Sequence, residues 1–349
     1  MKKLLSLLLS LSFLFCLSAC SLQSSQKRYT NSFIDLFDTV SSVTAYDSSE
    51  HSFNEHYSQF YNELKAYAQL YDIYEDYDGV VNLKYINENA AKAPVEVDKR
   101  IMELLLFGKE VYEISEGRVN ICMGSVLSVW HIERENGIEN PGSASLPDME
   151  LLKEKAEHTD IDKLILDEEN MTVYFADAEM QLDAGAIAKG YAAEKISEYI
   201  VQNKIWTSAV ISLGGNVKTI GFKNDDGNTP FVIGIENPKN STDYIAKINA
   251  SAQDTVVTSG DYQRYYTVDG VNYCHIINPK TLMPADFMSS VSVVSKNSAY
   301  ADMLSTALFN MRIEDGLNLV NGMSDTEAMW VDKNGEITYS DNFKNYAVK

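Results

Sequence analysis

The stretch Ala209-Val-Ile-Ser-Leu-Gly-Gly-Asn-Val-Lys-Thr-Ile-Gly221 decides the fold class. It holds two short apolar runs, residues 209–213 and 217–221, which are typical of β-strands bounded by glycine. More runs of this kind follow it with no helical pattern between them. They predict strands at residues 231–236, 246–250, 254–258 and 288–294, and hairpins at residues 265–273 and 326–340. Consecutive strands without crossover helices indicate a mixed, largely antiparallel sheet.

Helical periodicity is strongest before this block of strands. Aromatic and apolar residues between Phe53 and Tyr71 recur every three or four positions and predict a helix whose aromatic side chains lie in the core. A second helix is predicted over residues 98–115 with Asp98 as its N-cap, and a hairpin at residues 163–175. The predicted fold class is therefore α+β, with mixed, largely antiparallel sheets, flanking helices and an active site in a cleft between amino-terminal and carboxy-terminal segments.

The amino terminus has the pattern of a lipoprotein signal peptide. Lys2-Lys3 precede an apolar run, which ends in Leu17-Ser-Ala-Cys20. We expect residues 1–19 to be the signal peptide, Cys20 to carry lipid, residues 20–30 to form a polar tether and residues 31–349 to form the functional domain. An uncleaved membrane anchor is the alternative, but about 14 apolar positions fall short of the roughly 20 that span a bilayer. The expected location is the extracytoplasmic face of the cell membrane.

The net charge restricts the classes of partner that the protein can bind, and the cysteine count restricts its possible disulfides. The chain carries 50 acidic and 29 basic side chains, for a net charge of −21. Such a surface repels nucleic acid and anionic headgroups, so nucleic acid is not expected as a partner and membrane attachment should depend on the lipid. Cys122 and Cys274 are the cysteines of the predicted domain, either as two buried thiols or as a disulfide.

Three oxygen-bearing side chains near the carboxy terminus share one helix face. Asp302, Ser305 and Thr306 are spaced i, i+3 and i+4, so on a helix they project into a common space. Hard divalent cations prefer oxygen ligands of this kind, and magnesium takes one or two carboxylates together with phosphates and waters. The alternative is that Asp302 only caps the helix that follows it.

The stretch Asp183-Ala-Gly-Ala-Ile-Ala-Lys-Gly190 predicts a site for an anion. The pattern predicts a strand at residues 180–182, a turn made of small residues, and a helix that extends to residue 200. Small residues let the backbone approach a ligand closely, and a helix amino terminus favours anions, so Lys189 could face a phosphate. The alternative is an ordinary turn with a surface lysine. Neither a Walker loop nor a Gly-x-Gly-x-x-Gly fingerprint is present.

Seven collinear segments resemble the ApbE family of FAD:protein FMN transferases. They lie at residues 37–44, 117–124, 183–190, 212–217, 258–261, 275–284 and 301–306. The resemblance implies that FAD is the substrate and Mg²⁺ the cofactor. It further implies that FMN is transferred through a phosphoester bond to a threonine or serine hydroxyl of another protein, with release of AMP.

The resemblance also implies roles for individual residues. The metal ligands would be Asp302, Ser305, Thr306 and the backbone carbonyl of Ala186. Asp183 and Lys189 would contact FAD. The remaining members of the dinucleotide pocket would be Phe37, Tyr74, Val119, Asn120, Ile121, Ser259, Gly260 and Ile277.

Two residues are predicted to be catalytic, namely Asp302 through the metal and His275 as the general base. An unperturbed imidazole titrates near neutral pH and suits the removal of a proton from the acceptor hydroxyl. The alternative for His275 is a structural histidine in a strand.

The sequence departs from the family pattern at several positions. Asn120 and Cys122 replace a carboxylate and a hydroxyl, Asn278 replaces an aspartate, and Leu282 replaces a glycine, while Phe37 stands where methionine is frequent. The chain contains no acceptor segment of the family type, so an exported target flavoprotein is the expected partner. Two other functions remain open: a lipid-anchored FAD pyrophosphatase that yields FMN and AMP, and a passive flavin-binding lipoprotein.

Overall fold

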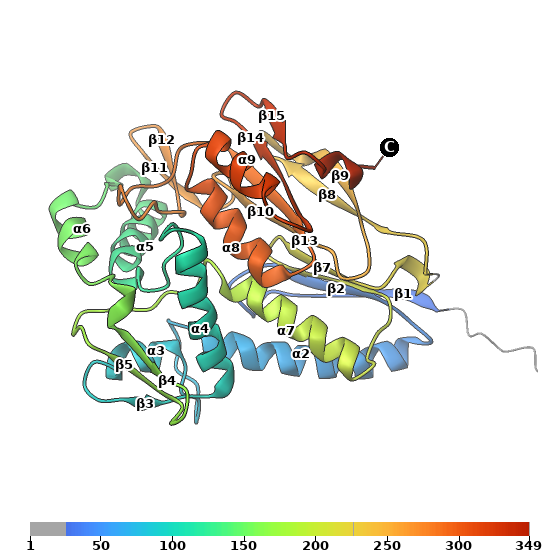
Figure 1. Ribbon diagram of the computed structural model, residues 1–349, viewed down its shortest axis with the longest axis horizontal. Coiled ribbons are helices and arrows are strands. Elements are labelled where there is room, and N and C mark those ends of the chain that lie inside the picture. The colour runs from blue at the N-terminus through green and yellow to red at the C-terminus, as the bar shows by residue number, and fades with distance from the viewer. Residues whose placement is uncertain (1–25, 226, 349) are drawn as a thin grey trace, which may run out of the picture.

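A long antiparallel sheet forms the centre of the protein (Figure 1). The structure is a computed structural model that describes residues 26–225 and 227–348. Within them the central sheet has eight strands in the order β1-β2-β6-β7-β10-β13-β14-β15, and every neighbouring pair is antiparallel. The strands are β1 (Lys27–Phe33), β2 (Ser41–Asp47), β6 (Ala209–Leu213), β7 (Asn216–Ile220), β10 (Thr255–Gly260), β13 (Ser290–Ser295), β14 (Thr326–Val331) and β15 (Ile337–Tyr339). The predicted α+β class is confirmed.

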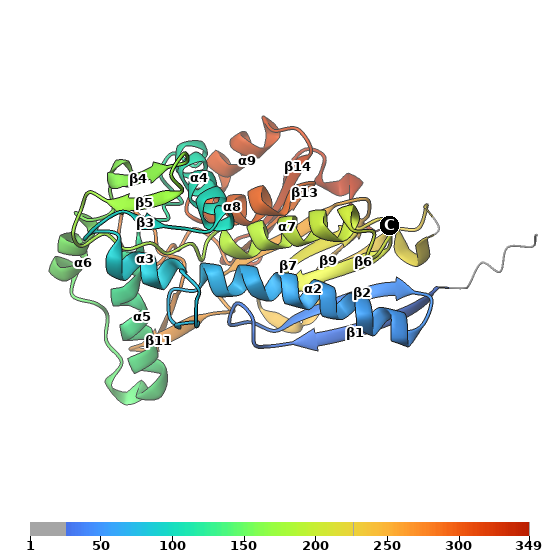
Figure 2. The same cartoon turned by 90° about the horizontal axis from the view of Figure 1, so that it is seen from below.

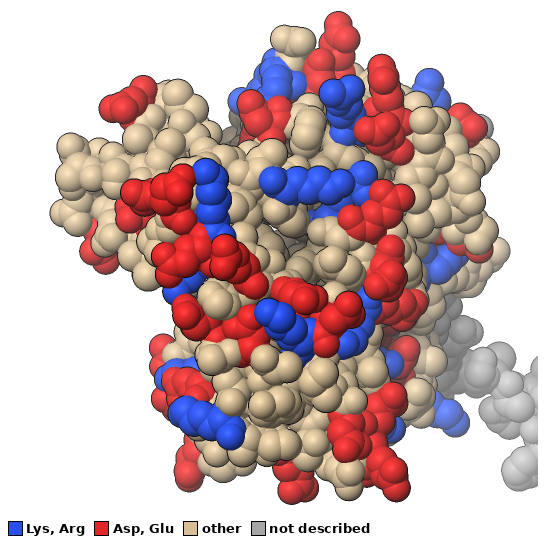
Figure 3. All heavy atoms as spheres, turned by 60° about the vertical axis from the view of Figure 1, so that its left-hand side comes forward, with Lys and Arg blue, Asp and Glu red and all other residues tan. Residues whose placement is uncertain are grey.

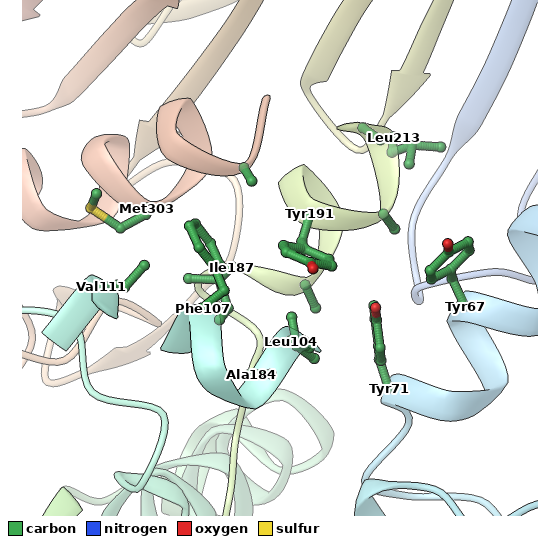
Figure 4. Close-up of a cluster of buried hydrophobic side chains, with 14 of the residues drawn as sticks. Tyr67, Tyr71, Leu104, Phe107, Val111, Ala184, Ile187, Tyr191, Leu213 and Met303 are labelled. Carbon is green, nitrogen blue, oxygen red and sulfur yellow. The ribbon is translucent and has the colours of Figure 1, made fainter. Parts of the chain in front are cut away.

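Three helices cover one face of this sheet. They are α2 (Glu50–Tyr71), α7 (Ala188–Gln202) and α8 (Ser298–Phe309), and α7 packs against both of the others. Figure 2 shows α2 and α7 side by side over the strands. In Figure 4, Tyr191 of α7 lies between Phe107 and Tyr71, with ring centroids 5.3 Å and 6.5 Å away. Phe107 belongs to α4 (Lys99–Ile114), which completes this helical layer.

The other face is covered by the hairpin of β8 (Phe231–Asn237) and β9 (Asn240–Ala250). Ile235 and Ile248 of this hairpin share a core with Val256 of β10, whereas the next residue, Val257, belongs to the core under the helices. Side chains alternate across a strand, so β10 is buried on both faces. The same holds for β13, all of whose residues are buried.

Smaller elements surround one end of the sheet. They are α3 (Leu83–Asn89), β3 (Val95–Glu96), α5 (Gly124–Glu139), α6 (Met149–Ala156), β4 (Leu164–Asp167), β5 (Thr172–Phe175), β11 (Tyr265–Val268) and β12 (Val271–Cys274). The helix α9 (Ile313–Asn321) instead packs against β14. Met123, Val126 and Trp130 at α5 form a separate apolar core with Tyr266 of β11. This core joins α5 to the β11–β12 hairpin.

Several boundaries differ from the sequence predictions. The strand predicted at residues 180–182 is wrong, because Gln181 makes only an isolated bridge to Met123. The alternative role of Asp302 as an N-cap is also wrong, because the side chain of Asn297 caps α8 and Asp302 lies inside the helix. β1 begins at Lys27, within the segment predicted as a tether, and pairs with β2 along its length.

Cys122 and Cys274 are buried free thiols, as one of the two alternatives predicted. None of the helices in the described ranges is long and apolar enough to cross a membrane. The predicted signal peptide and Cys20 lie outside the described residues.

Candidate active site

A cavity of about 1290 Å³ lies where the predicted site segments meet. Small-ligand pockets have about 300 to 1,000 Å³, so this cavity has room for a dinucleotide. Figure 3 shows a face of the molecule with a hollow that acidic and basic side chains border. The predicted residues that line the cavity are Phe37, Tyr74, Val119, Asn120, Asp183, Ala186, Lys189, Ser259, Gly260, His275, Ile277, Asp302 and Thr306. Amino-terminal and carboxy-terminal segments thus share one cavity.

The contact between α7 and α8 brings together the predicted anion site at residues 183–190 and the predicted metal ligands at residues 301–306. The backbone N–H of Gly190 donates to Oδ2 of Asp302 at 2.7 Å. A methyl group at position 190 would overlap the Cβ of Asp302 and the backbone carbonyl of Ser298. Only glycine therefore allows the two helices to approach this closely. Lys189 and Asp302, which are far apart in the sequence, both face the cavity as a result.

Two carboxylates face Lys189 from different elements. Burial raises the pKa of Asp302, and the Lys189 ammonium and the Gly190 N–H oppose this rise. Burial likewise raises the pKa of Asp183, against the Gly185 N–H and Lys189. Asp183 also fixes the turn before α7, because its Oδ1 accepts from the Gly185 N–H at 2.8 Å. A bound cation would stabilise the ionised form of Asp302, which burial disfavours.

The donor set at this point fits a hard cation. Among residues 26–225 and 227–348, no three His, Cys, Asp or Glu side chains gather to hold a metal ion. A mixed set of oxygen donors is available instead, since Asp302, Thr306 and Ala186 all line the cavity. One carboxylate, one hydroxyl and one backbone carbonyl leave positions for substrate phosphates and waters, which is the usual environment of Mg²⁺ in proteins.

Ser305 and Ile121 lie behind the cavity wall. The Ser305 hydroxyl donates to the Asp302 carbonyl and lies 2.8 Å from the Ser259 hydroxyl. Ser305 has no exposed surface and does not line the cavity, whereas Ser259 does. Ile121 is also buried and would touch any side chain placed at Gly108 of α4. Both residues support the wall from behind.

His275 follows β12 directly and lies on the cavity wall. Its Nδ1 lies 3.2 Å from the Arg264 carbonyl, which can only accept a hydrogen bond. This contact requires a proton on Nδ1 and leaves Nε2 as an acceptor. Burial, followed by the charges of Lys189 and Arg264, lowers the pKa of His275 to about 3. The imidazole is therefore neutral at physiological pH and has a free lone pair.

Two arginines at the cavity, and a histidine ring next to Tyr74, were not predicted from the sequence. The Tyr74 ring lies 5.1 Å from the His131 ring, and His131 Nδ1 lies 2.7 Å from Arg134. Arg134 and Arg264 line the same cavity and oppose the negative charge of the whole chain. His131 and Arg134 belong to α5, a helix that the sequence prediction missed, so their position near Tyr74 could not be inferred.

The loop between β1 and β2 reaches the cavity in a strained conformation. Phe37 and Asp38 have φ values of 58° and 49°, in the left-handed region that non-glycine residues rarely adopt. The Asp38 carbonyl accepts a hydrogen bond from Arg264, and Thr39 packs against Gly214 of the β6–β7 turn. Strain of this kind is retained where the surrounding contacts fix the loop, and it is frequent at functional sites.

Asn120 is held on both sides of its amide. Its Nδ2 donates to the Thr159 carbonyl at 2.8 Å, and its Oδ1 accepts from the Cys122 N–H at 2.8 Å. Asn120 therefore shapes the cavity wall through internal hydrogen bonds.

The chain is similar to known proteins over most of its length. The model of the ApbE family matches residues 37–330. An FAD:protein FMN transferase from Klebsiella pneumoniae (strain 342) is 30% identical over 285 residues, which cover 81% of this chain and 84% of the relative. An FAD:protein FMN transferase from Treponema pallidum (strain Nichols) is 33% identical over 261 residues, covering 71% and 70%.

Solved structures give the same result. The crystal structure of the ApbE protein from Thermotoga maritima superposes with a TM-score of 0.80 at 28% identity, and the match covers 93% of this chain and 100% of that one. The flavin transferase ApbE from Vibrio cholerae has the same fold, with a TM-score of 0.72 at 21% identity and coverage of 92% and 99%. This chain therefore belongs to the ApbE family.

Proposed function

We propose that this protein is a Mg²⁺-dependent FAD:protein FMN transferase. It binds FAD in the cavity and attaches FMN to a threonine or serine hydroxyl of an exported target protein, with AMP as the second product. The observation that carries the proposal is the Gly190–Asp302 contact, which brings Lys189 and the oxygen donors of α8 into one cavity. The names of the relatives from K. pneumoniae and T. pallidum give the reaction class.

Asp302, Thr306 and the Ala186 carbonyl would hold the magnesium ion. When bound, Mg²⁺ neutralises charge on the diphosphate and so eases cleavage of its bridging bond. Lys189 adds a fixed positive charge on the same side of the cavity. Arg134 and Arg264 extend this field toward the cavity walls, which favours an anionic dinucleotide in spite of the net charge of −21.

The acceptor hydroxyl needs a base, and His275 is suited to this role. The hydroxyl oxygen forms a bond to the phosphorus of the FMN half. The bond from that phosphorus to the bridging oxygen breaks, and AMP leaves with this oxygen. The hydroxyl proton passes to Nε2 of His275, whose lone pair is free because Nδ1–H donates to Arg264. The anionic diphosphate next to His275 would raise its low pKa toward the working range of a base.

Mass spectrometry of an acceptor protein after incubation with FAD and Mg²⁺ tests the proposal. We expect a covalent FMN adduct and AMP, and the loss of both in Asp302→Ala. Free FMN without an adduct would identify the protein as an FAD pyrophosphatase, and unchanged FAD would identify it as a passive binder.

We further propose that the protein works on the extracytoplasmic face of the cell membrane, attached through a lipid on Cys20. The signal-like residues 1–19 and the net charge of −21 support this, because a strongly acidic chain is repelled by anionic headgroups and needs another means of attachment. Fatty-acid labelling of cells that express the full chain should mark the wild type and not Cys20→Ser. Labelling of both proteins, or of neither, would contradict the proposed anchor.

A further inference from the structure

An ion pair between a buried lysine, Lys218, and a partly buried glutamate, Glu194, lies next to the cavity wall. Lys218 of β7 has no exposed surface, and its ammonium donates to Oε2 of Glu194 at 2.9 Å. It also donates to the carbonyls of Gln253 and Lys296, at 3.0 Å and 2.7 Å. All three of its donors are therefore used.

The same pair also binds the start of α8. The backbone N–H of Ser298, the first residue of α8, donates to Oε2 of Glu194 at 2.6 Å. Glu194 belongs to α7 and Lys218 to the central sheet. One carboxylate oxygen thus joins the sheet, the middle of α7 and the amino terminus of α8, where a negative charge is also favoured by the helix dipole.

The pair is in register with the candidate metal site. Glu194 is four residues after Gly190, and Ser298 is four residues before Asp302, which is about one helical turn, or roughly 6 Å, in each helix. A side chain at Gly190 would meet both Ser298 and Asp302, so the same short stretch of α8 touches α7 at both levels. Lys218 is two residues after Asn216 and on the same side of β7, and Asn216 lines the cavity.

The chemistry of the pair indicates a role in positioning. Burial lowers the pKa of Lys218, and Glu194 opposes this shift. Ion pairs in protein interiors are often no more stabilising than apolar side chains of the same volume, but in some proteins they select one geometry. Here the geometry that they define is the spacing and the axial position of α7 and α8.

We propose that Lys218 and Glu194 are positioning residues for the metal and diphosphate site. The pair holds α8 against α7, and thereby holds Asp302 against the Gly190 N–H and beside Lys189. This inference rests on the proposed function, since it concerns the same site.

The test uses a double variant that removes both charges and keeps the side-chain volumes, Lys218→Met with Glu194→Gln. The glutamine amide retains an oxygen for the Ser298 N–H. We expect a cooperatively folded protein in which the Mg²⁺ concentration for half-maximal FMN transfer rises by about 10-fold to 100-fold, the range found when partners of metal ligands are removed. Excess Mg²⁺ should restore part of the rate. The matched control is Lys163→Met with Asp177→Asn. These two side chains form an ion pair with an N–O distance of 2.8 Å, and neither residue lines the cavity. This double variant should leave the Mg²⁺ dependence unchanged.

A folded double variant with wild-type transfer and a wild-type Mg²⁺ midpoint would overturn the inference. If the double variant does not fold, Glu194→Gln alone replaces it, because Lys218 then keeps its two carbonyl acceptors. The Mg²⁺ dependence of FAD binding, measured by flavin fluorescence, is a second readout that requires no transfer. Absence of transfer by the wild type would refute the proposed function, whereas an unchanged Mg²⁺ midpoint for FAD binding in the variant would refute the positioning role.

Discussion

Replacement of Gly190 by alanine tests the helix contact on which the site depends. The added methyl group would overlap Asp302 Cβ and the Ser298 carbonyl, and neither is the far end of a flexible side chain. Carbon atoms pack at about 3.5 to 4.0 Å, so α7 and α8 would have to separate by roughly 1 Å. Such a displacement lengthens the Gly190–Asp302 hydrogen bond and moves the carboxylate away from Lys189.

The expected magnitudes follow from this displacement. Overpacking costs about 1 to 3 kcal/mol, and the higher helix propensity of alanine returns about 1 kcal/mol, so we expect a folded protein with a slightly lower melting temperature. A misplacement of about 1 Å can reduce catalysis by roughly 100-fold. We therefore expect FMN transfer to fall far more than stability.

The assay compares initial rates of adduct formation, by mass spectrometry, with thermal melting of the same samples. Gly316→Ala is the control, because Gly316 is also helical and its added methyl group would meet the Leu308 and Trp330 side chains at 3.1 Å and 3.2 Å. It should keep full transfer. Wild-type rates in Gly190→Ala would show that the close approach of α7 and α8 is not needed for the reaction.

Four other substitutions test single side chains of the site. Asp302→Asn should abolish transfer and yet raise the melting temperature at pH 7 without Mg²⁺. Burial raises the pKa of Asp302, so the ionised carboxylate destabilises the folded state at any pH above the pKa that Asp302 has in the unfolded chain. A lower melting temperature would contradict this. Thr306→Ala should raise the Mg²⁺ requirement more than Ser305→Ala, since only Thr306 lines the cavity, and the reverse order in a Mg²⁺ titration would make Ser305 the ligand. Because the folded pKa of His275 is lowered to about 3, this group weakens folding as the pH falls from about 7 toward 3. His275→Ala should flatten that part of the stability curve in denaturant titrations and also slow transfer at pH 7, and an unchanged rate would assign the base elsewhere.

Periodicity explains which elements could be predicted from the sequence. α2 and α4 carry regular apolar faces, and Asp98 does cap α4. The strands from β6 onward are short apolar runs between turn residues, and their predicted positions are confirmed within two residues, except that β9 begins at Asn240, six residues before the predicted start. β1 was missed because Lys27–Phe33 is mostly polar and its pairing with β2 stabilises it as an edge strand. α5 was missed because its apolar residues do not form a continuous stripe.

The site residues likewise divide into those with a local sequence pattern and those whose position depends on packing. Asp183, Lys189, Asp302 and Thr306 stand in short motifs whose chemistry is visible in the sequence, and all four line the cavity. Arg134, Arg264 and the Lys218–Glu194 pair carry no local signal. Their positions depend on how α5, the β11–β12 hairpin and β7 pack, and only the folded chain brings them to the site.

The contact between α7 and α8 has a consequence for how the protein folds during its synthesis. Asp302 follows Gly190 by more than a hundred positions, so a ribosome must finish most of the polypeptide before the reactive centre can assemble. Contacts of such long sequence separation form late and slow the search for the native state. A chain that ends before α8 would lack Asp302 and Thr306, so the reactive centre would be complete only after α8 has been synthesised and has packed against α7.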